Sequence, residues 1–158
     1  MSREVLRYLR QAAEVALQTM EAGIGGPFGA IIIKDGEVIA ASGNAVLQEN
    51  DPTAHAEVQA IRKACRVLGR YHLDDCTLYA TCEPCPMCLG AIYWARIPKV
   101  IYGSTRHDAE NAGFIDRLLL DEMQKPPSER SVNMTLQPLP EALNLFEVWR
   151  QIEEKRTY

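Results

Sequence analysis

Two short segments rich in metal-binding side chains constrain this 158-residue chain more than any other feature. They are Thr53-Ala54-His55-Ala56-Glu57 and Glu83-Pro84-Cys85-Pro86-Met87-Cys88. Each stands at the expected start of a helix, where the partial positive charge of the helix N-terminus favours thiolate over thiol. Cysteines three residues apart at such a position reach the same ion, and a proline suits the first helical turn. The fold must therefore bring two helix starts to one metal ion.

His55 is the expected third ligand beside Cys85 and Cys88. Three protein ligands leave a fourth position for water, which is typical of a catalytic zinc site. Glu57, two residues after the histidine, points in a different direction and can face the substrate as general base and then as general acid. The pattern H-x-E followed by P-C-x-x-C is the signature of zinc deaminases that act on bases. The pattern predicts one Zn²⁺ per chain and Glu57 as the catalytic residue.

Other assignments of the cysteines remain open. Cys85 and Cys88 alone also fit a redox pair, although the H-x-E segment would then have no task. Cys82 forms a second C-x-x-C with Cys85, so a closed structural zinc site with one His and three Cys is a further alternative. Cys65 and Cys76 are expected to be core residues.

The composition, with 47% apolar and 24% charged residues, is that of a globular protein, and the length fits a single domain over 1–158. No apolar run approaches the roughly 18 residues of a membrane span. The N-terminus lacks the apolar region of a secretory signal, so we expect a cytoplasmic protein without a membrane partner. An odd number of cysteines argues for reduced thiols. The net charge of −4 disfavours nucleic acid, whose partners usually carry a basic patch.

Apolar periodicity and turn residues predict alternating helices and strands. The first helix is capped by Ser2 and stops near Gly23, and a helix capped by Thr53 is closed by Gly69. The turn 34–37 joins two strands in a hairpin. The expected strands are 28–33, 38–41, 76–80, 100–102 and 132–136, and the other expected helices run from 86 to before 98 and over 141–154. These elements predict an α/β sandwich whose sheet is mostly parallel after the hairpin.

The chain resembles the cytidine-deaminase-fold superfamily and, within it, the small bacterial guanine deaminases, over almost its whole length. Beyond the zinc signature, the resemblance is carried by AGIGGPFGAIIIKDG, NDPTAHAEVQAIRKAC, LDDCTLYATCEPCPMCLGAIYWARIPKV and a C-terminal LFEVW followed by KRTY. It implies a three-layer α/β/α sandwich with a five-stranded mixed sheet, hydrolysis of guanine to xanthine and ammonia, and a homodimer. It also implies a C-terminal segment, about 141–158, that closes over an active site, its own or that of the partner.

The same resemblance implies a set of substrate contacts. Asn44 would offer the purine edge a donor and an acceptor, Phe28 and Trp94 would sandwich the ring, and Asp116 would accept from the donors on guanine N1 and N2. Tyr158 would be the closing contact of the tail. Taken as residues alone, these positions also fit a turn asparagine, a core tryptophan, a helix N-cap and a frayed terminus.

Two other functions are alternatives. The tRNA adenosine deaminases share DPTAHAE and EPC-x-MC with this chain, whereas GIGGPFG and the tail ending in tyrosine distinguish it from them. A non-catalytic structural zinc module would use four protein ligands and leave no open position. The acidic charge and the full-length resemblance favour a deaminase of a free base.

Overall fold

The computed structural model describes residues 2–157, which form two compact units. The first unit ends at Asp116 and the second begins at Arg117. The elements of the first unit are α1 (Arg3–Glu21), β1 (Gly29–Lys34), β2 (Glu37–Gly43), α2 (Val46–Glu49), α3 (Ala56–Leu68), β3 (Thr77–Cys82), α4 (Pro86–Trp94), β4 (Lys99–Ser104) and α5 (Arg106–Asn111). Those of the second unit are α6 (Arg117–Gln124), the 3₁₀ turn η1 (Pro127–Glu129) and α7 (Pro140–Gln151). The whole zinc signature therefore lies in the first unit.

The first helix begins and packs as its sequence predicts. The Ser2 hydroxyl accepts a hydrogen bond from the Val5 amide at 3.2 Å, which caps α1. Tyr8 and Ala12 lie on the buried face of the helix. The Tyr8 hydroxyl donates to the Gly36 carbonyl at 2.7 Å and ties the helix to the β1–β2 hairpin. Gly36, with φ of 82°, adopts the left-handed conformation that the expected tight turn requires.

The four strands form one mixed sheet in the order β2-β1-β3-β4. β1 pairs antiparallel with both β2 and β3, and β3 pairs parallel with β4. After the hairpin, β3 and β4 pair in parallel as expected, whereas β3 joins the hairpin antiparallel to β1, so the sheet as a whole is mixed. The crossover through α3 joins β2 to β3, which run in the same direction but lie on either side of β1, so each is antiparallel to it.

The expected fifth strand over 132–136 does not form in the part of the chain that the structure describes. Val132, Met134 and Leu136 alternate with polar residues, which is the pattern of a half-buried strand. Their side chains are instead exposed, in an irregular segment of the second unit. A strand is stable only where a neighbouring strand pairs with its backbone N–H and C=O groups. Within residues 117–157 the structure contains no strand that could pair with this segment.

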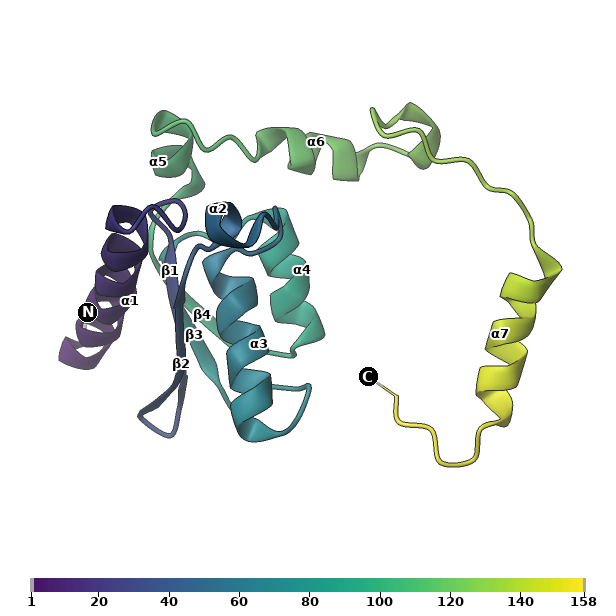
Figure 1. The fold of residues 1–158 in the computed structure, drawn as a ribbon, viewed down its shortest axis with the longest axis horizontal. Coiled ribbons are helices and arrows are strands. Elements are labelled where there is room, and N and C mark those ends of the chain that lie inside the picture. Colours follow the sequence, from purple (N-terminus) through teal and green to yellow (C-terminus); the bar gives the residue numbers. More distant parts are fainter. Residues whose placement is uncertain (1, 158) are drawn as a thin grey trace. The chain divides into compact units, whose positions relative to one another are not determined.

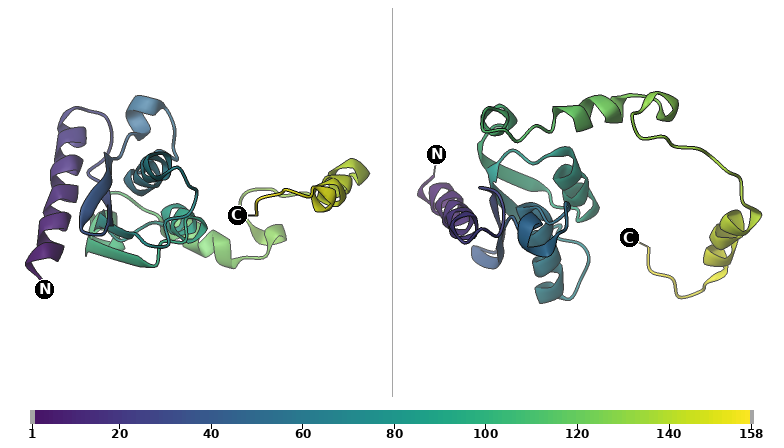
Figure 2. Two further views of the ribbon diagram at one scale, coloured as in Figure 1. Left: turned by 90° about the horizontal axis from the view of Figure 1, so that it is seen from below. Right: turned by 45° about the horizontal axis from the view of Figure 1, so that its top comes forward.

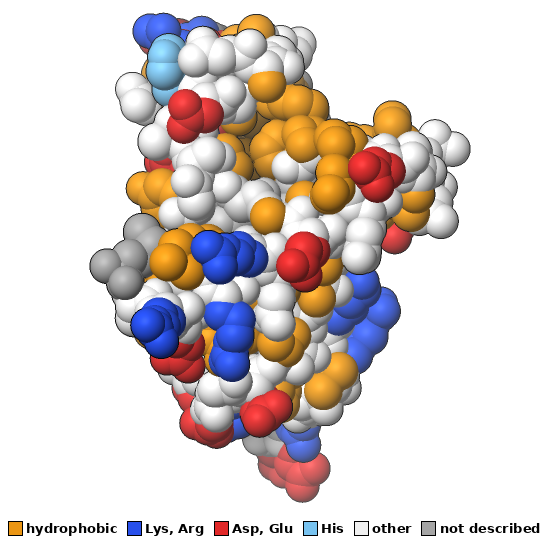
Figure 3. Space-filling model, turned by 90° about the vertical axis from the view of Figure 1, so that its left-hand side faces the viewer, with side chains coloured by type: hydrophobic (Ala, Val, Ile, Leu, Met, Phe, Trp, Pro, Cys, Tyr) orange, Lys and Arg blue, Asp and Glu red, His pale blue; other side chains and the backbone are white. Residues whose placement is uncertain are grey.

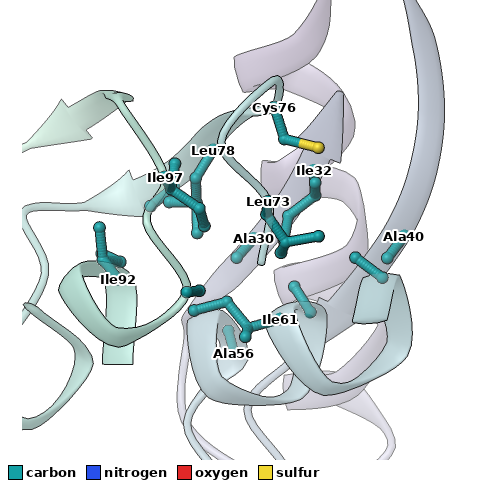
Figure 4. Packing of buried hydrophobic residues seen from close by; sticks show 14 residues of the cluster. Ala30, Ile32, Ala40, Ala56, Ile61, Leu73, Cys76, Leu78, Ile92 and Ile97 are labelled. Atoms are coloured by element: carbon teal, nitrogen blue, oxygen red, sulfur yellow. The ribbon is translucent and has the colours of Figure 1, made fainter. Parts of the chain in front are cut away.

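Helices cover both faces of the sheet, which gives the expected three layers (Figure 1; Figure 2). α1 packs on one face, over β1, β2 and β3, and α3 packs on the other. Successive side chains of β1 point to opposite faces of the sheet and pack into two separate hydrophobic clusters. Ile31 and Ile33 pack with Tyr8 beneath α1. Ala30 and Ile32 belong to the larger cluster beneath α3. Figure 4 shows this larger cluster. The continuous apolar run of β1 therefore reflects burial on both faces.

Gly29, at the start of β1, is a point of close approach between the sheet and α1. A Cβ added there would overlap the carbonyl oxygen of Ala12 and lie 3.0 Å from the amide nitrogen of Ala16. Because these are backbone atoms of a helix, they cannot rotate away. We expect Gly29→Ala to lower the free energy of unfolding by about 1–3 kcal/mol, the usual cost of overpacking. Urea unfolding followed by circular dichroism measures this, and an unchanged midpoint would contradict the close approach.

The second unit consists of short elements held by local bonds. Glu122 of α6 accepts hydrogen bonds from the Ser131 amide at 2.6 Å and hydroxyl at 3.0 Å, and it pairs with Lys125 at 2.6 Å. Lys125 and Ser131 lower the pKa of Glu122 to about 2. No helix within residues 2–157 is long and apolar enough to cross a membrane. The exposed hydrophobic side chains of α6 and α7 include Leu118, Leu119, Met123, Leu143, Leu145, Phe146 and Trp149.

Candidate metal centre

Both helices that carry the zinc signature begin with a metal-binding residue. His55 is the N-cap residue of α3 and Cys85 that of α4, and neither side chain makes the capping hydrogen bond usual at this position. The expectation that Thr53 caps α3 is wrong. The Thr53 amide and hydroxyl both donate to the Asp51 carboxylate at 2.7 Å, in a local turn ahead of the helix. Gly69 closes α3 in the left-handed conformation, as predicted.

The side chains of His55, Cys85 and Cys88 converge on one point. The Nδ1 atom of His55 lies 3.5 Å from the Sγ atom of each cysteine, and the three ligand atoms all lie within 4.8 Å of one another. Tetrahedral zinc, with bonds of ~2.0–2.1 Å to nitrogen and ~2.3 Å to sulfur, places such atoms about 3.5 Å apart. The spacing and the donor chemistry of these three residues therefore fit a zinc ion.

Glu57 lies beside this cluster on the first turn of α3. Its side chain is buried, and Oε2 accepts a hydrogen bond from the Cys88 thiol at 3.5 Å. Burial raises the pKa of the Glu57 carboxyl because water no longer stabilises its charged form. A carboxyl in such a position can take up and release a proton beside the metal.

The three cluster residues influence one another's protonation. Hydrogen bonds from the Cys88 thiol and the His55 imidazole lower the pKa of Cys85. The hydrogen bond to Cys85, together with burial, raises the pKa of Cys88. The bond with Cys85 also raises the pKa of His55. A metal ion binds cysteine as thiolate and histidine as neutral imidazole, so metal binding at this cluster is coupled to the release of protons.

The other cysteines stand apart from the cluster. Cys82 donates from its thiol to the Thr105 carbonyl at 3.3 Å, and burial raises its pKa. It does not belong to the metal-binding group formed by the described residues, so the geometry does not support the closed four-ligand site. All five cysteines are free thiols, which argues against a disulfide between Cys85 and Cys88. Cys76 is buried in the core as expected, and Cys65 packs against it.

Asn44 is buried at the end of β2 and holds two backbone segments. Its Oδ1 atom accepts hydrogen bonds from the Gly26 and Val46 amides, both at 3.2 Å. A Cβ on Gly25 would overlap this same oxygen, so the glycine permits the close approach of the two segments. The sequence suggested that the amide offers both a donor and an acceptor to a ligand. In the structure the side-chain oxygen is already bonded to two backbone amides, so the side-chain nitrogen is the group that can donate to a ligand.

The aromatic candidates differ in their surroundings. Phe28 is half-buried and packs edge-on against Phe114, with ring centroids 4.8 Å apart. A cavity of about 160 Å³ lies beside Phe28 at the carboxyl ends of β3 and β4, with Thr81 and Ser104 in its walls. Trp94, the last residue of α4, is exposed in the chain, so the alternative of a core tryptophan is wrong.

The two remaining candidates lie near or beyond the edge of the first unit. Asp116 is half-buried; burial raises the pKa of its carboxyl, and the charge of Arg106 opposes this shift. Asp116 is therefore close enough to Arg106 for their charges to interact. Tyr158 lies outside the described residues.

An ion pair between Glu83 and Arg106 borders the centre, and the sequence did not single it out. The Arg106 guanidinium donates from Nη2 to Oε1 of Glu83 at 2.6 Å, and the Arg106 amide donates to Oε2 at 3.3 Å. The hydrogen bond from Arg106 lowers the pKa of the Glu83 carboxyl. Glu83 stands just ahead of the P-C-x-x-C motif, but its partner follows 23 residues later. No local spacing could have revealed the pair.

Known proteins share both the sequence and the fold of this chain. Residues 2–104 match the family of the cytidine and deoxycytidylate deaminase zinc-binding region. The guanine deaminase of Bacillus subtilis (strain 168) is 54% identical over 151 residues, which are 96% of this chain and 97% of the relative. The crystal structure of guanine deaminase from Bacillus subtilis has a TM-score of 0.95 at 52% identity, with 100% of this chain and 99% of that chain covered.

A second group of relatives is more distant. The tRNA-specific adenosine deaminase of Aquifex aeolicus (strain VF5) is 39% identical over 139 residues, which are 88% of this chain and 89% of the relative. The alignment with this chain covers most of the length of both relatives, so the likeness is not confined to the zinc-binding segments. The chain therefore belongs to the zinc-binding deaminase family of cytidine and deoxycytidylate deaminases.

Proposed function

We propose that this protein hydrolyses guanine to xanthine and ammonia. The observation that carries the proposal is the convergence of His55, Cys85 and Cys88 beside the buried Glu57. This arrangement occurs in a chain that is 54% identical, nearly end to end, to a guanine deaminase. Hydrolysis adds water to the ring carbon that bears the amino group, breaks the bond from that carbon to nitrogen, and releases the nitrogen as ammonia.

One zinc ion per chain would be held by His55, Cys85 and Cys88. When bound, zinc acts as a Lewis acid that makes water acidic enough to lose a proton near neutral pH. Glu57 accepts this proton on its carboxylate and passes it to the departing amino nitrogen. The carboxylate is thus restored at the end of each turnover. Its burial keeps bulk water from exchanging the proton in transit.

The substrate contacts that we propose are those implied by the resemblance to guanine deaminases. Asn44, whose acceptor is already used, donates from its amide nitrogen to an acceptor on the purine edge. Asp116 accepts from the donors on guanine N1 and N2, and Phe28 and Trp94 contact the ring faces. Tyr158 closes the site from the chain terminus.

The two units act as a single deaminase domain in a homodimer. α6 and α7 contain no buried residue in the isolated chain, and their large hydrophobic side chains are exposed. Short helices with uncovered apolar faces are marginal in water and gain stability by packing on another protein surface. The C-terminal segment, about 141–158, closes over an active site in this assembly, its own or that of the partner. The free thiols fit a cytoplasmic location.

The direct test is a substrate screen with purified, zinc-loaded protein. Guanine, adenine, cytosine and cytidine are incubated separately, xanthine is followed by ultraviolet absorbance, and ammonia is assayed in every reaction. We expect release of ammonia with guanine and formation of xanthine in equal amount. Absence of both products would reject the proposal.

The relation to a tRNA-specific adenosine deaminase supplies the competing outcome. It predicts formation of inosine in a tRNA and RNA binding that weakens steeply with salt. The net charge of −4 argues against it. On the face drawn in Figure 3, basic, acidic and hydrophobic side chains are interspersed, without a continuous basic stripe. Inosine formation in place of xanthine formation would transfer the assignment to this class.

Removal of the last three residues tests the role of the tail. We expect deletion of 156–158 to lower kcat/KM for guanine by about tenfold, the effect of losing one good hydrogen bond to substrate. The melting temperature should change little, because terminal residues contribute few core contacts. Parallel measurements of guanine turnover and thermal unfolding separate the two effects. Equal losses of activity and stability would show that the tail is structural.

A further inference from the structure

The Glu83–Arg106 pair joins the metal-binding loop to the start of α5. Glu83 lies between β3 and the N-cap residue of α4, and Arg106 is the first residue of α5. Both oxygens of the Glu83 carboxylate accept from the same partner, one from the guanidinium and one from the backbone amide. The Glu83 amide also donates to the Ser104 carbonyl at 2.9 Å. The loop is therefore fixed by its backbone and by its side chain to the segment that follows β4.

The pair lies close in sequence to the proposed metal ligand Cys85 and close in space to the proposed substrate contact Asp116. Cys85 follows Glu83 by two residues, and Pro84 and Pro86 stiffen the chain on either side of the cysteine. Movement of Glu83 is thus transmitted to the position of the Cys85 sulfur. At the other end, the charge of Arg106 interacts with the carboxylate of Asp116. Both side chains of the pair are partly shielded from water, with 27% and 29% of their surface exposed, so their interaction is less screened than that of a surface pair.

We propose that Glu83 and Arg106 form a positioning pair that holds Cys85 at the bonding distance of the metal and orients the start of α5 toward the substrate. The inference rests on the proposed function, because it assumes that Cys85 binds zinc. Neither residue needs to touch the metal or the base. Residues that support metal ligands in this indirect way typically contribute about 10–100-fold to metal affinity or activity.

A second ion pair in the same unit provides a matched control. Arg70 pairs with Asp75, just ahead of the start of β3, whereas Glu83 follows the end of this strand. The two pairs are therefore separated by the length of β3. Arg70→Met removes an ion pair from the segment between α3 and β3 without altering the loop that carries Cys85. Its effect on melting temperature calibrates what the loss of an ion pair alone does to the fold.

The experiment compares zinc release from the full-length protein and from Glu83→Gln, Arg106→Met, the double variant and Arg70→Met. A chromogenic chelator in excess reports the rate of release, and the visible spectrum of the cobalt-substituted protein reports the geometry of the thiolate ligands. We expect Glu83→Gln and Arg106→Met each to release zinc about 10–100-fold faster and to change the cobalt spectrum. The double variant should be no worse than the single ones, because the two residues act as a unit.

Arg106→Lys, which keeps the charge, should restore slow release to within a few-fold of the unaltered protein, and Arg70→Met should match that protein. The proposal is overturned if Glu83→Gln and Arg106→Met release zinc at the unaltered rate, if their effects add in the double variant, or if Arg70→Met behaves in the same way. A different failure belongs to the proposed function itself: the unaltered protein would then bind no zinc and release no ammonia from guanine.

Discussion

Replacing Glu57 by glutamine is expected to lower kcat for guanine by about 10²–10⁴-fold, the range that a positioned acid–base group contributes. Glutamine keeps the length of the side chain and one acceptor oxygen but cannot take up the proton. Glu57 lies beside the three cluster residues and is not one of them. Zinc content should therefore stay the same while turnover falls. Steady-state kinetics and elemental analysis of the same preparation measure the two quantities.

Glu14→Gln is the matched control, because Glu14 is exposed on α1. It makes the same change of side chain and of net charge, and we expect it to leave both zinc content and kcat unchanged. A Glu57→Gln protein that turns over guanine at a rate close to that of the control would remove Glu57 from its catalytic role. Loss of zinc from Glu57→Gln would instead assign the carboxylate to the metal.

Replacing Cys88 by alanine is expected to abolish stable zinc binding and guanine turnover together. The Cys88 sulfur lies 3.5 Å from the His55 nitrogen and is fully buried, so neither water nor a neighbouring side chain can easily take its place. We expect a loss of more than about 100-fold in zinc affinity, beyond that of residues that act on the ligands indirectly. Zinc stabilises the native state by binding to it, so added zinc should raise the melting temperature of the unaltered protein far more than that of the variant.

Two further cysteine substitutions separate loss of a ligand from loss of a thiol. Cys65→Ala changes a cysteine that packs against the core, and Cys82→Ala changes the neighbour that donates to Thr105. We expect both proteins to keep zinc and turnover. If Cys82→Ala lost zinc as Cys88→Ala does, the closed four-ligand site would be correct and the open coordination position would not exist.

The parts of this fold that the sequence predicts are those in which local pattern and burial agree. α1 combines a capping serine with an apolar stripe, and the stripe is the face that packs on the sheet. Gly69 and Gly36 adopt the left-handed conformations expected of a helix end and of a tight turn. The cluster of His55 with two cysteines was predicted for a different reason, since its chemistry demands that distant segments meet.

The parts that the sequence does not predict depend on tertiary neighbours or on local bonds that compete with the expected ones. The alternation over 132–136 is a sound strand pattern, but no strand lies beside it in the described part of the second unit. Thr53 is a good capping residue that is already bonded to Asp51. The bond that Asn44 accepts from the Gly26 amide, 18 residues earlier, leaves no trace in the sequence around it. Each of these outcomes was decided by which groups the fold brings into contact.

The uncapped starts of α3 and α4 set protein stability against enzyme function at two positions. A serine or aspartate at position 55 or 85 would be a good cap, worth about 1 kcal/mol to its helix. Each would also remove the imidazole or thiolate that the chemistry needs. Selection for a more stable protein and selection for a working enzyme therefore favour different residues at these positions. A variant that has gained thermal stability and lost activity is therefore expected to carry substitutions at position 55 or 85.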